Sequence, residues 1–169
     1  YDISGEQPEK LWVRGSEEWT GGVIWGDKAV SRIGTMVNIR TGDPLEPLWD
    51  ASGQKEAPVV VVAGDTLVTL DGSTLTGYSP EGTVKWSIPD LPWLRIAVNG
   101  EGSVLGLSYQ DATADKAIGV VSPDGEITYL TPYSAEGVDP EDVPGWMGVQ
   151  GQNGSFQPLA DGWLLTTQS

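Results

Sequence analysis

The sequence contains no histidine and no cysteine. These absences exclude zinc sites built on imidazole or thiolate, His-ligated haem, disulfide frameworks, and catalysis by a Cys nucleophile or a Ser-His-Asp triad. Positive charge is also scarce, because 9 Lys and Arg residues stand against 24 Asp and Glu residues and leave a net charge of −15. Nucleic acids and anionic lipids are bound through clustered basic side chains, so neither is an expected partner.

Long apolar runs are lacking as well. The longest, residues 58–63, is far shorter than the roughly 20 residues that span a bilayer, so no membrane insertion is expected. The 169 residues suffice for one domain, and 38% hydrophobic with 20% charged residues is typical of a folded chain. The missing initiator Met and basic leader favour a mature or trimmed product, and the missing thiols fit an exported bacterial protein.

What the sequence does contain is the pattern of strands and hairpins. Apolar residues alternate, or form short β-rich stretches bounded by Gly, Asp, Asn and Pro, and no segment sustains a 3.6-residue period. A helical turn is conceivable only within Ser134–Val143. The sequence therefore predicts an all-β protein. The predicted strands are Val23–Trp25, Lys28–Ile33, Thr35–Ile39, Val59–Ala63, Thr66–Leu70, Thr74–Tyr78, Thr83–Ile88, Val104–Tyr109, Ala117–Val121, Glu126–Thr131 and Trp163–Thr167.

Two hairpin motifs recur along the chain. Ser79–Trp86 and Ser122–Tyr129 each run Ser-Pro-acid-Gly and continue into an alternating strand that ends in an aromatic residue. Val23–Ser31 is echoed by Val61–Thr69, where a Gly-Asp turn joins two apolar strands, and a looser copy begins at Val98. The unit is thus four strands in about 40 residues, which matches one blade of a β-propeller.

We expect a single propeller segment over residues 1–169. Its blades are predicted at about 10–50, 57–90 and 94–132, with a partial blade at 145–169 and an insert between blades at 132–154. Three and a half blades do not close a ring, because propellers usually have four to eight, and an open blade edge invites pairing with other chains. The remaining blades are expected from the rest of a longer chain or from a second subunit.

Two segments carry a family resemblance. Thr41-Gly42-Asp43 followed by Leu48-Trp49, and the segment Tyr78–Trp86, resemble the turn-and-tryptophan signature of the PQQ-like (BamB-type) β-propeller repeat family. The resemblance implies a β-propeller in which Trp49 and Trp86 pack between neighbouring blades. Quinone-dependent dehydrogenases with such repeats bind their cofactor and Ca²⁺ in a complete ring, often with a Cys pair. A chain with few blades and no Cys is expected to bind no cofactor.

Three other tryptophans are candidates for an exposed recognition surface. Trp19, Trp93 and Trp146 lie near Gly, Pro or charged residues, and aromatic rings offer large rigid contact areas. Acidic loops are the second candidates, and they comprise residues 111–115 and the group Asp139, Glu141 and Asp142. Oxygen ligands suit Ca²⁺, but neither loop has the spacing of a Ca²⁺-binding loop, so solvated loops are the expectation and no metal is predicted.

The function expected from these observations is non-catalytic. The chain is interpreted as an extracytoplasmic β-propeller, periplasmic, cell-surface or secreted, that acts as a protein-interaction scaffold, for example as an accessory part of a bacterial cell-envelope assembly. Its charge favours a basic protein partner. The alternative is a carbohydrate-binding or glycoside-cleaving propeller that uses exposed Trp and paired carboxylates, whose separation the sequence cannot fix.

Overall fold

The computed structural model describes residues 21–49, 57–108 and 118–129, together with the backbone of residues 155–158 and 163–166. Every regular element in these ranges is a β-strand, so the predicted all-β class is confirmed for the described part of the chain. Within the same ranges, the structure has no helix with the length and apolarity that crossing a membrane requires.

The strands form three four-stranded antiparallel sheets and one two-stranded sheet. In each four-stranded sheet the strands lie side by side in chain order, so every connection is a hairpin. The first sheet holds β1 (Gly22–Trp25), β2 (Lys28–Ser31), β3 (Met36–Asn38) and β4 (Pro44–Leu45); the second β5 (Val59–Ala63), β6 (Thr66–Asp71), β7 (Thr74–Tyr78) and β8 (Val84–Ile88); the third β9 (Arg95–Val98), β10 (Val104–Leu107), β11 (Ile118–Val121) and β12 (Ile127–Tyr129); and the last β13 (Ser155–Pro158) and β14 (Trp163–Thr166).

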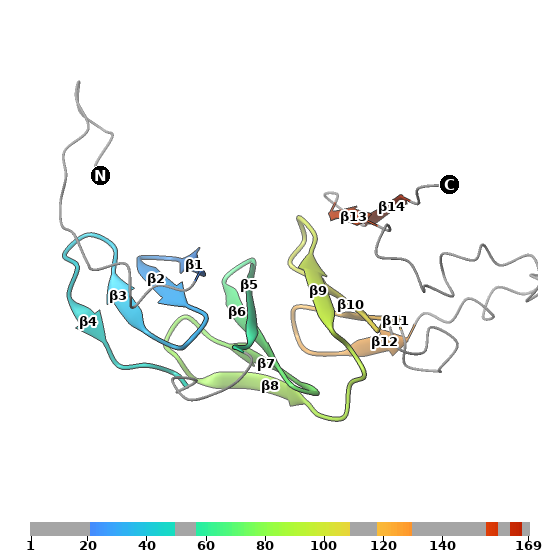
Figure 1. Ribbon diagram of the computed structural model, residues 1–169, viewed down its shortest axis with the longest axis horizontal. Helices are drawn as coiled ribbons and strands as arrows, with labels where there is room; N and C mark the ends of the chain where they lie inside the picture. The colour runs from blue at the N-terminus through green and yellow to red at the C-terminus, as the bar shows by residue number, and fades with distance from the viewer. Residues whose placement is uncertain (1–20, 50–56, 109–117, 130–154, 159–162, 167–169) are drawn as a thin grey trace, which may run out of the picture.

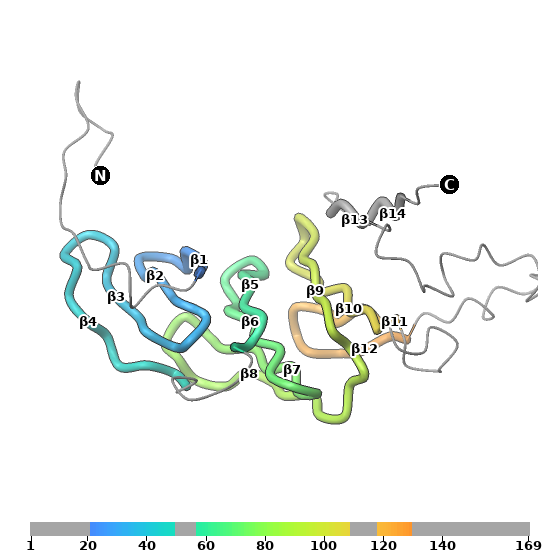
Figure 2. The backbone as a smooth tube through the Cα atoms, viewed as in Figure 1, coloured from blue at the N-terminus to red at the C-terminus, as the bar shows by residue number. Residues whose placement is uncertain are grey.

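The three larger sheets stand in a row, as Figures 1 and 2 show. Their first strands are neighbours, because β1 lies against β5 and β5 lies against β9. The last strands, β4, β8 and β12, form the opposite edges of the sheets. The described sheets do not close into a ring (Figure 1).

Two apolar seams hold the row together. In the first seam, Trp25, Val30 and Met36 of the first sheet pack against Val60 and Leu67 of the second. In the second seam, second-sheet residues meet the third sheet and the loop that leads into it; the buried members are Ala63, Val68, Leu70, Leu75, Leu91, Trp93, Ile96, Val104 and Val121. Strand β6 contributes to both seams, because neighbouring residues of a strand point to opposite faces: Leu67 lies in the first seam and Val68 in the second.

The predicted Gly-Asp echo is real and has one geometry. Gly26 and Gly64 are the first residues of two-residue hairpin turns, with φ of +59° and +64°, and the Asp that follows each of them has negative φ. A positive φ at the first turn position alone is the type II′ turn, which suits the twist of a hairpin and favours Gly there. The 38-residue spacing therefore marks equivalent turns between β1 and β2 and between β5 and β6.

The Ser-Pro-acid-Gly turns are also equivalent. Gly82 and Gly125 have φ of +86° and +87°, and each donates its N–H to the carbonyl of the serine three residues earlier, at 2.8 Å and 2.9 Å. These are three-residue hairpin loops that end in a left-handed glycine. The same backbone pattern recurs at residues 31–35 and 99–103, without the Ser-Pro sequence.

The strands that follow these two turns differ, although both sequence motifs end in an aromatic residue, Trp86 in one and Tyr129 in the other. In the second sheet the register shifts, so that Tyr78 pairs with Val84 but Gly77 pairs with Trp86, and Lys85 is an extra residue. In the third sheet the pairing is regular and Tyr129 pairs with Gly119. The irregularity turns Trp86 towards the third sheet, whereas Tyr129 faces back towards the second.

Strand boundaries depart from the sequence prediction at several points. Strands β4, β9 and β13 were not predicted as separate strands, because β4 has two residues with a Pro and β9 opens on a charged Arg95. Strand β2 ends at Ser31 rather than Ile33, since residues 31–35 form a turn. The predicted helical turn at Ser134–Val143 and the first residues of the blade expected at 10–50 lie outside the described residues.

Candidate functional site

Three turns at the ends of the first strands line up across the sheets. We call them the inner turn row: Gly26–Asp27, Gly64–Asp65 and Asn99–Gly102. The first two are linked by a hydrogen bond from the indole N–H of Trp25 to the carbonyl of Asp65, at 2.6 Å. The second and third are in close contact, since a Cβ built on Gly102 would lie 3.3 Å from the backbone nitrogen of Gly64.

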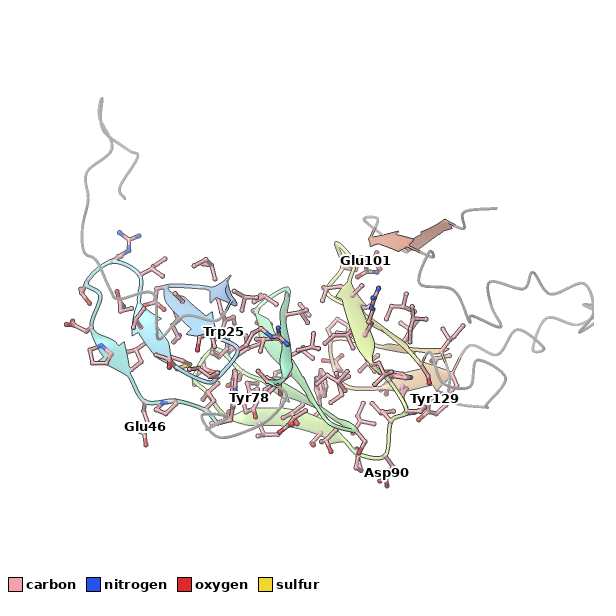
Figure 3. All side chains as sticks on the ribbon, viewed as in Figure 1. Trp25, Glu46, Tyr78, Asp90, Glu101 and Tyr129 are labelled. Atoms are coloured by element: carbon pink, nitrogen blue, oxygen red, sulfur yellow. The ribbon has the colours of Figure 1, made fainter. Side chains whose placement is uncertain are left out.

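The inner turn row displays carboxylates. Asp27, Asp65 and Glu101 are exposed, and each belongs to a different sheet. Figure 3 shows Glu101 at the tip of the β9 hairpin, whereas Glu46 and Asp90 lie at the opposite border of the row of sheets. The sheets thus present one carboxylate per sheet at neighbouring short turns, and each turn joins two strands that pair with one another.

Lys28 fastens the first turn to its surroundings. Its ammonium group lies 4.9 Å from the centroid of the Trp25 ring, within the range of a cation–π contact. The same Nζ atom is 3.3 Å from Asp27 Oδ1 and donates to the carbonyl of Pro80 at 3.1 Å. Lys28 therefore connects the first turn of the inner turn row to the turn at residues 79–83, between β7 and β8 of the second sheet.

Lys85 fastens the second turn in a similar way. Its Nζ donates to Thr66 Oγ1 at 2.9 Å and lies 3.9 Å from Asp65 Oδ1. Because Lys85 is the extra residue of the irregular β8 pairing, the register shift supplies this contact as well as the orientation of Trp86. Each lysine therefore offsets part of the negative charge of the aspartate beside it, Lys28 that of Asp27 and Lys85 that of Asp65.

Glu81 lies in the turn at residues 79–83, and its surroundings favour the ionised carboxylate. A hydrogen bond from the Ser79 side chain lowers the pKa of the Glu81 carboxyl below its ordinary value of 4.5, and a backbone hydrogen bond adds to the effect. The charge of Asp65 acts on the pKa of Glu81 in the opposite direction and the charge of Lys28 in the same one, so both lie close enough to influence Glu81. The acidic surface extends from the inner turns to Glu81.

The arrangement has the chemistry of a contact surface. Among the described residues, no three acidic side chains are grouped so that they could hold a metal ion. The carboxylates stand on rigid turns at the surface, where they can pair with cations but are exposed to water and salt, which weakens each pair. Several such ion pairs side by side make binding specific, because the partner's cations must match the positions of the carboxylates, although no single pair adds much affinity.

The predicted packing role of Trp49 and Trp86 is confirmed. Trp49 follows β4 and meets Tyr78 of the second sheet, with ring centroids 6.1 Å apart. Trp86 donates its indole N–H to the carbonyl of Pro123 at 3.2 Å, and its ring lies against Gly125, where a Cβ would collide with it. Each ring therefore joins one sheet to the next.

The expectation that Trp93 is an exposed recognition residue is wrong. Trp93 is 1% exposed and lies in the second seam. Its indole covers Gly106 and Gly119, which pair across β10 and β11 and leave a flat slot that a Cβ on either glycine would fill. The neighbouring Pro and Asp indicated a surface loop. The ring is buried instead because two glycines, which are far from Trp93 in the sequence but lie on paired strands, leave space for it.

The other predicted surface residues lie outside the described part of the chain. These are Trp19, Trp146, Asp139, Glu141 and Asp142, and the acidic loop at residues 111–115 lies outside it too. Conversely, Trp25 and the acids of the inner turn row were not predicted as functional residues. The repeated Gly-Asp pair is a sequence signal for Asp27 and Asp65, because it places an acid at the same turn of neighbouring sheets.

Comparison with protein-family models and with curated proteins finds no relative. No protein-family model matches the chain. No curated protein matches it in sequence.

Proposed function

We propose that this chain is part of a β-propeller and acts as a protein-interaction scaffold whose inner turn row docks a basic segment of a partner protein. The observation that carries the docking role is the alignment of Asp27, Asp65 and Glu101 on neighbouring rigid turns of three sheets. Charge complementarity of this kind speeds association and fixes orientation more than it adds affinity. A non-catalytic role outside the cytoplasm of a bacterium, for instance in an envelope assembly, is part of the proposal.

Two features support the propeller. Four-stranded meanders whose first strands are neighbours are the blade arrangement of that fold. In addition, the face of the third sheet turned away from the second is apolar, with Leu105, Leu107, Ile118 and Val120. Leu105 and Ile118 are buried there, so both faces of the third sheet are apolar and covered, as in a blade that lies between two others. We propose further blades from a longer chain or a second subunit, and native mass spectrometry distinguishes the two.

The carbohydrate alternative loses one of its supports. It relied on exposed tryptophans, and Trp93 is buried in the second seam. Trp25 is buried too, while Trp49 and Trp86 join neighbouring sheets. Among the described residues, the indoles serve packing rather than a stacking platform for sugars.

The docking proposal is tested with a short Lys- and Arg-rich peptide and two variants of equal net charge. Asp27→Asn/Asp65→Asn/Glu101→Gln neutralises the inner turn row, and Glu46→Gln/Asp71→Asn/Asp90→Asn neutralises three exposed acids elsewhere. At about 0.5 kcal/mol for each exposed pair, the first variant raises the Kd about tenfold, measured by calorimetry at low salt. The second changes it far less. Equal losses in the two variants would show that only overall charge attracts the peptide, and would refute docking at the row.

A further inference from the structure

The third turn of the inner turn row contains an Asn-Gly pair, Asn99-Gly100. Asparagine followed by glycine is the pair most prone to deamidation, because glycine has no side chain to hinder the backbone nitrogen that attacks the amide. Asparagine is in general a thermolabile residue. Asn99 is only 8% exposed, although it stands in a turn at the end of a sheet.

The reaction at this pair is internal and needs only water. The backbone nitrogen of Gly100 loses its proton and attacks Cγ of Asn99; the Cγ–Nδ2 bond breaks, and the side-chain nitrogen leaves as ammonia. Water then opens the five-membered succinimide at one of its two carbonyls and gives aspartate or isoaspartate. Ring closure requires the backbone and side-chain dihedrals of Asn99 to rotate until the Gly100 nitrogen faces Cγ.

The fold fixes both sets of dihedrals. The backbone of Asn99 donates to the carbonyl of Ser103 and accepts from the N–H of Gly102, both at 3.1 Å. The side-chain Oδ1 accepts from the N–H groups of Glu101 at 3.1 Å and Ser103 at 2.9 Å. Such a side-chain cap on a turn holds the asparagine in one conformation. Four hydrogen bonds must therefore yield before the ring can form.

We propose that Asn99 is a latent deamidation site, closed while the turn between β9 and β10 is folded and reactive once that turn opens. Opening exposes the amide by local unfolding, which is a general route to reactions that the native state prevents. The product adds a carboxylate beside Glu101 and, as isoaspartate, a methylene to the backbone of the turn. The change is irreversible and marks chains whose third sheet has opened. The proposal is independent of the proposed docking function.

The test follows deamidation of the natural chain by peptide mass spectrometry, with isoaspartate resolved by chromatography, at mildly alkaline pH with and without unfolding urea. Asn153-Gly154 in the unfolded sample reports the rate of the same dipeptide in the same solution. We expect Asn99 to react at a rate comparable to Asn153 in urea, and more than about tenfold more slowly in the native protein. Equal rates at Asn99 in the two conditions would overturn the proposal.

Two variants test whether opening of the turn between β9 and β10 controls the deamidation of Asn99. Gly102 has φ of +81° and lies against the backbone of Gly64, so Gly102→Ala strains the turn and is expected to speed native deamidation of Asn99 severalfold. Gly72→Ala imposes a similar φ strain, at +55°, in the turn between β6 and β7 and is expected to leave the rate unchanged. The same acceleration in both variants would show that global rather than local opening exposes Asn99.

Discussion

Burial of Trp93 over two glycines predicts a specific energetic coupling between residues 93 and 106. Trp93→Ala removes a fully buried indole from the second seam, and such substitutions cost about 3–5 kcal/mol of the free energy of unfolding. Gly106→Ala places a methyl group where the indole lies, and overpacking of this kind costs about 1–3 kcal/mol. Gly106 does not have a positive φ, so its cost is steric alone.

The double variant tests whether the two costs share one cause. With Trp93 already reduced to Ala, the methyl group on residue 106 enters vacated space, and the second substitution is nearly free. The coupling energy is then about 1–3 kcal/mol, measured by urea unfolding of the four proteins of the cycle. Gly72→Ala is the control, because nothing lies within 4 Å of its added Cβ and its cost adds to that of Trp93→Ala. Additive costs for the pair at 93 and 106 would refute the packing.

Three further outcomes follow from contacts elsewhere in the row. Trp25→Phe keeps an aromatic ring but loses the indole N–H that donates to the Asp65 carbonyl, and should lower the free energy of unfolding by about 1–2 kcal/mol. No loss of stability in thermal unfolding would contradict the hydrogen bond. Ser31→Ala should leave the free energy of unfolding unchanged or raise it by up to about 1 kcal/mol, because the buried Ser31 hydroxyl has no hydrogen-bond partner in the described part of the chain. A marked loss of stability would show that the hydroxyl does have such a partner. Because the pKa of Glu81 is lowered in the folded protein, its carboxylate contributes stability above pH 4.5, and this stability is lost as the pH falls through the folded-state pKa. Ser79→Ala should raise the pKa of Glu81 towards 4.5 in an NMR titration. An unchanged pKa would exclude the Ser79 hydroxyl as the cause of the shift.

Local sequence rules predicted the turns well. Gly26, Gly64, Gly82 and Gly125 each sit where a hairpin needs a positive φ, and that requirement is written in two to four adjacent residues. All strands except β4, β9 and β13 followed from apolar alternation or short apolar stretches for the same reason, because that pattern lies within the strand itself. The four-strand repeat, and with it the all-β class, could therefore be inferred without coordinates.

Features that depend on residues far apart could not be inferred in that way. The slot for Trp93 needs Gly106 and Gly119 to meet across two strands, and the orientation of Trp86 depends on one extra residue in a neighbouring pairing. The inner turn row likewise arises only when three sheets stand side by side. Trp93 was misassigned because its immediate neighbours resemble a loop, whereas its burial is decided by partners more than ten residues away.

Consecutive sheets are joined face to face through indole rings, and this packing brings the inner turns into a row. The most direct test is the set of nuclear Overhauser contacts made by two of these rings. The structure predicts contacts from the Trp86 ring to the α protons of Gly125, and from the Trp25 indole proton to the turn at Gly64–Asp65. Indole contacts confined to each ring's own sheet would contradict the arrangement of the sheets and the docking surface that depends on it.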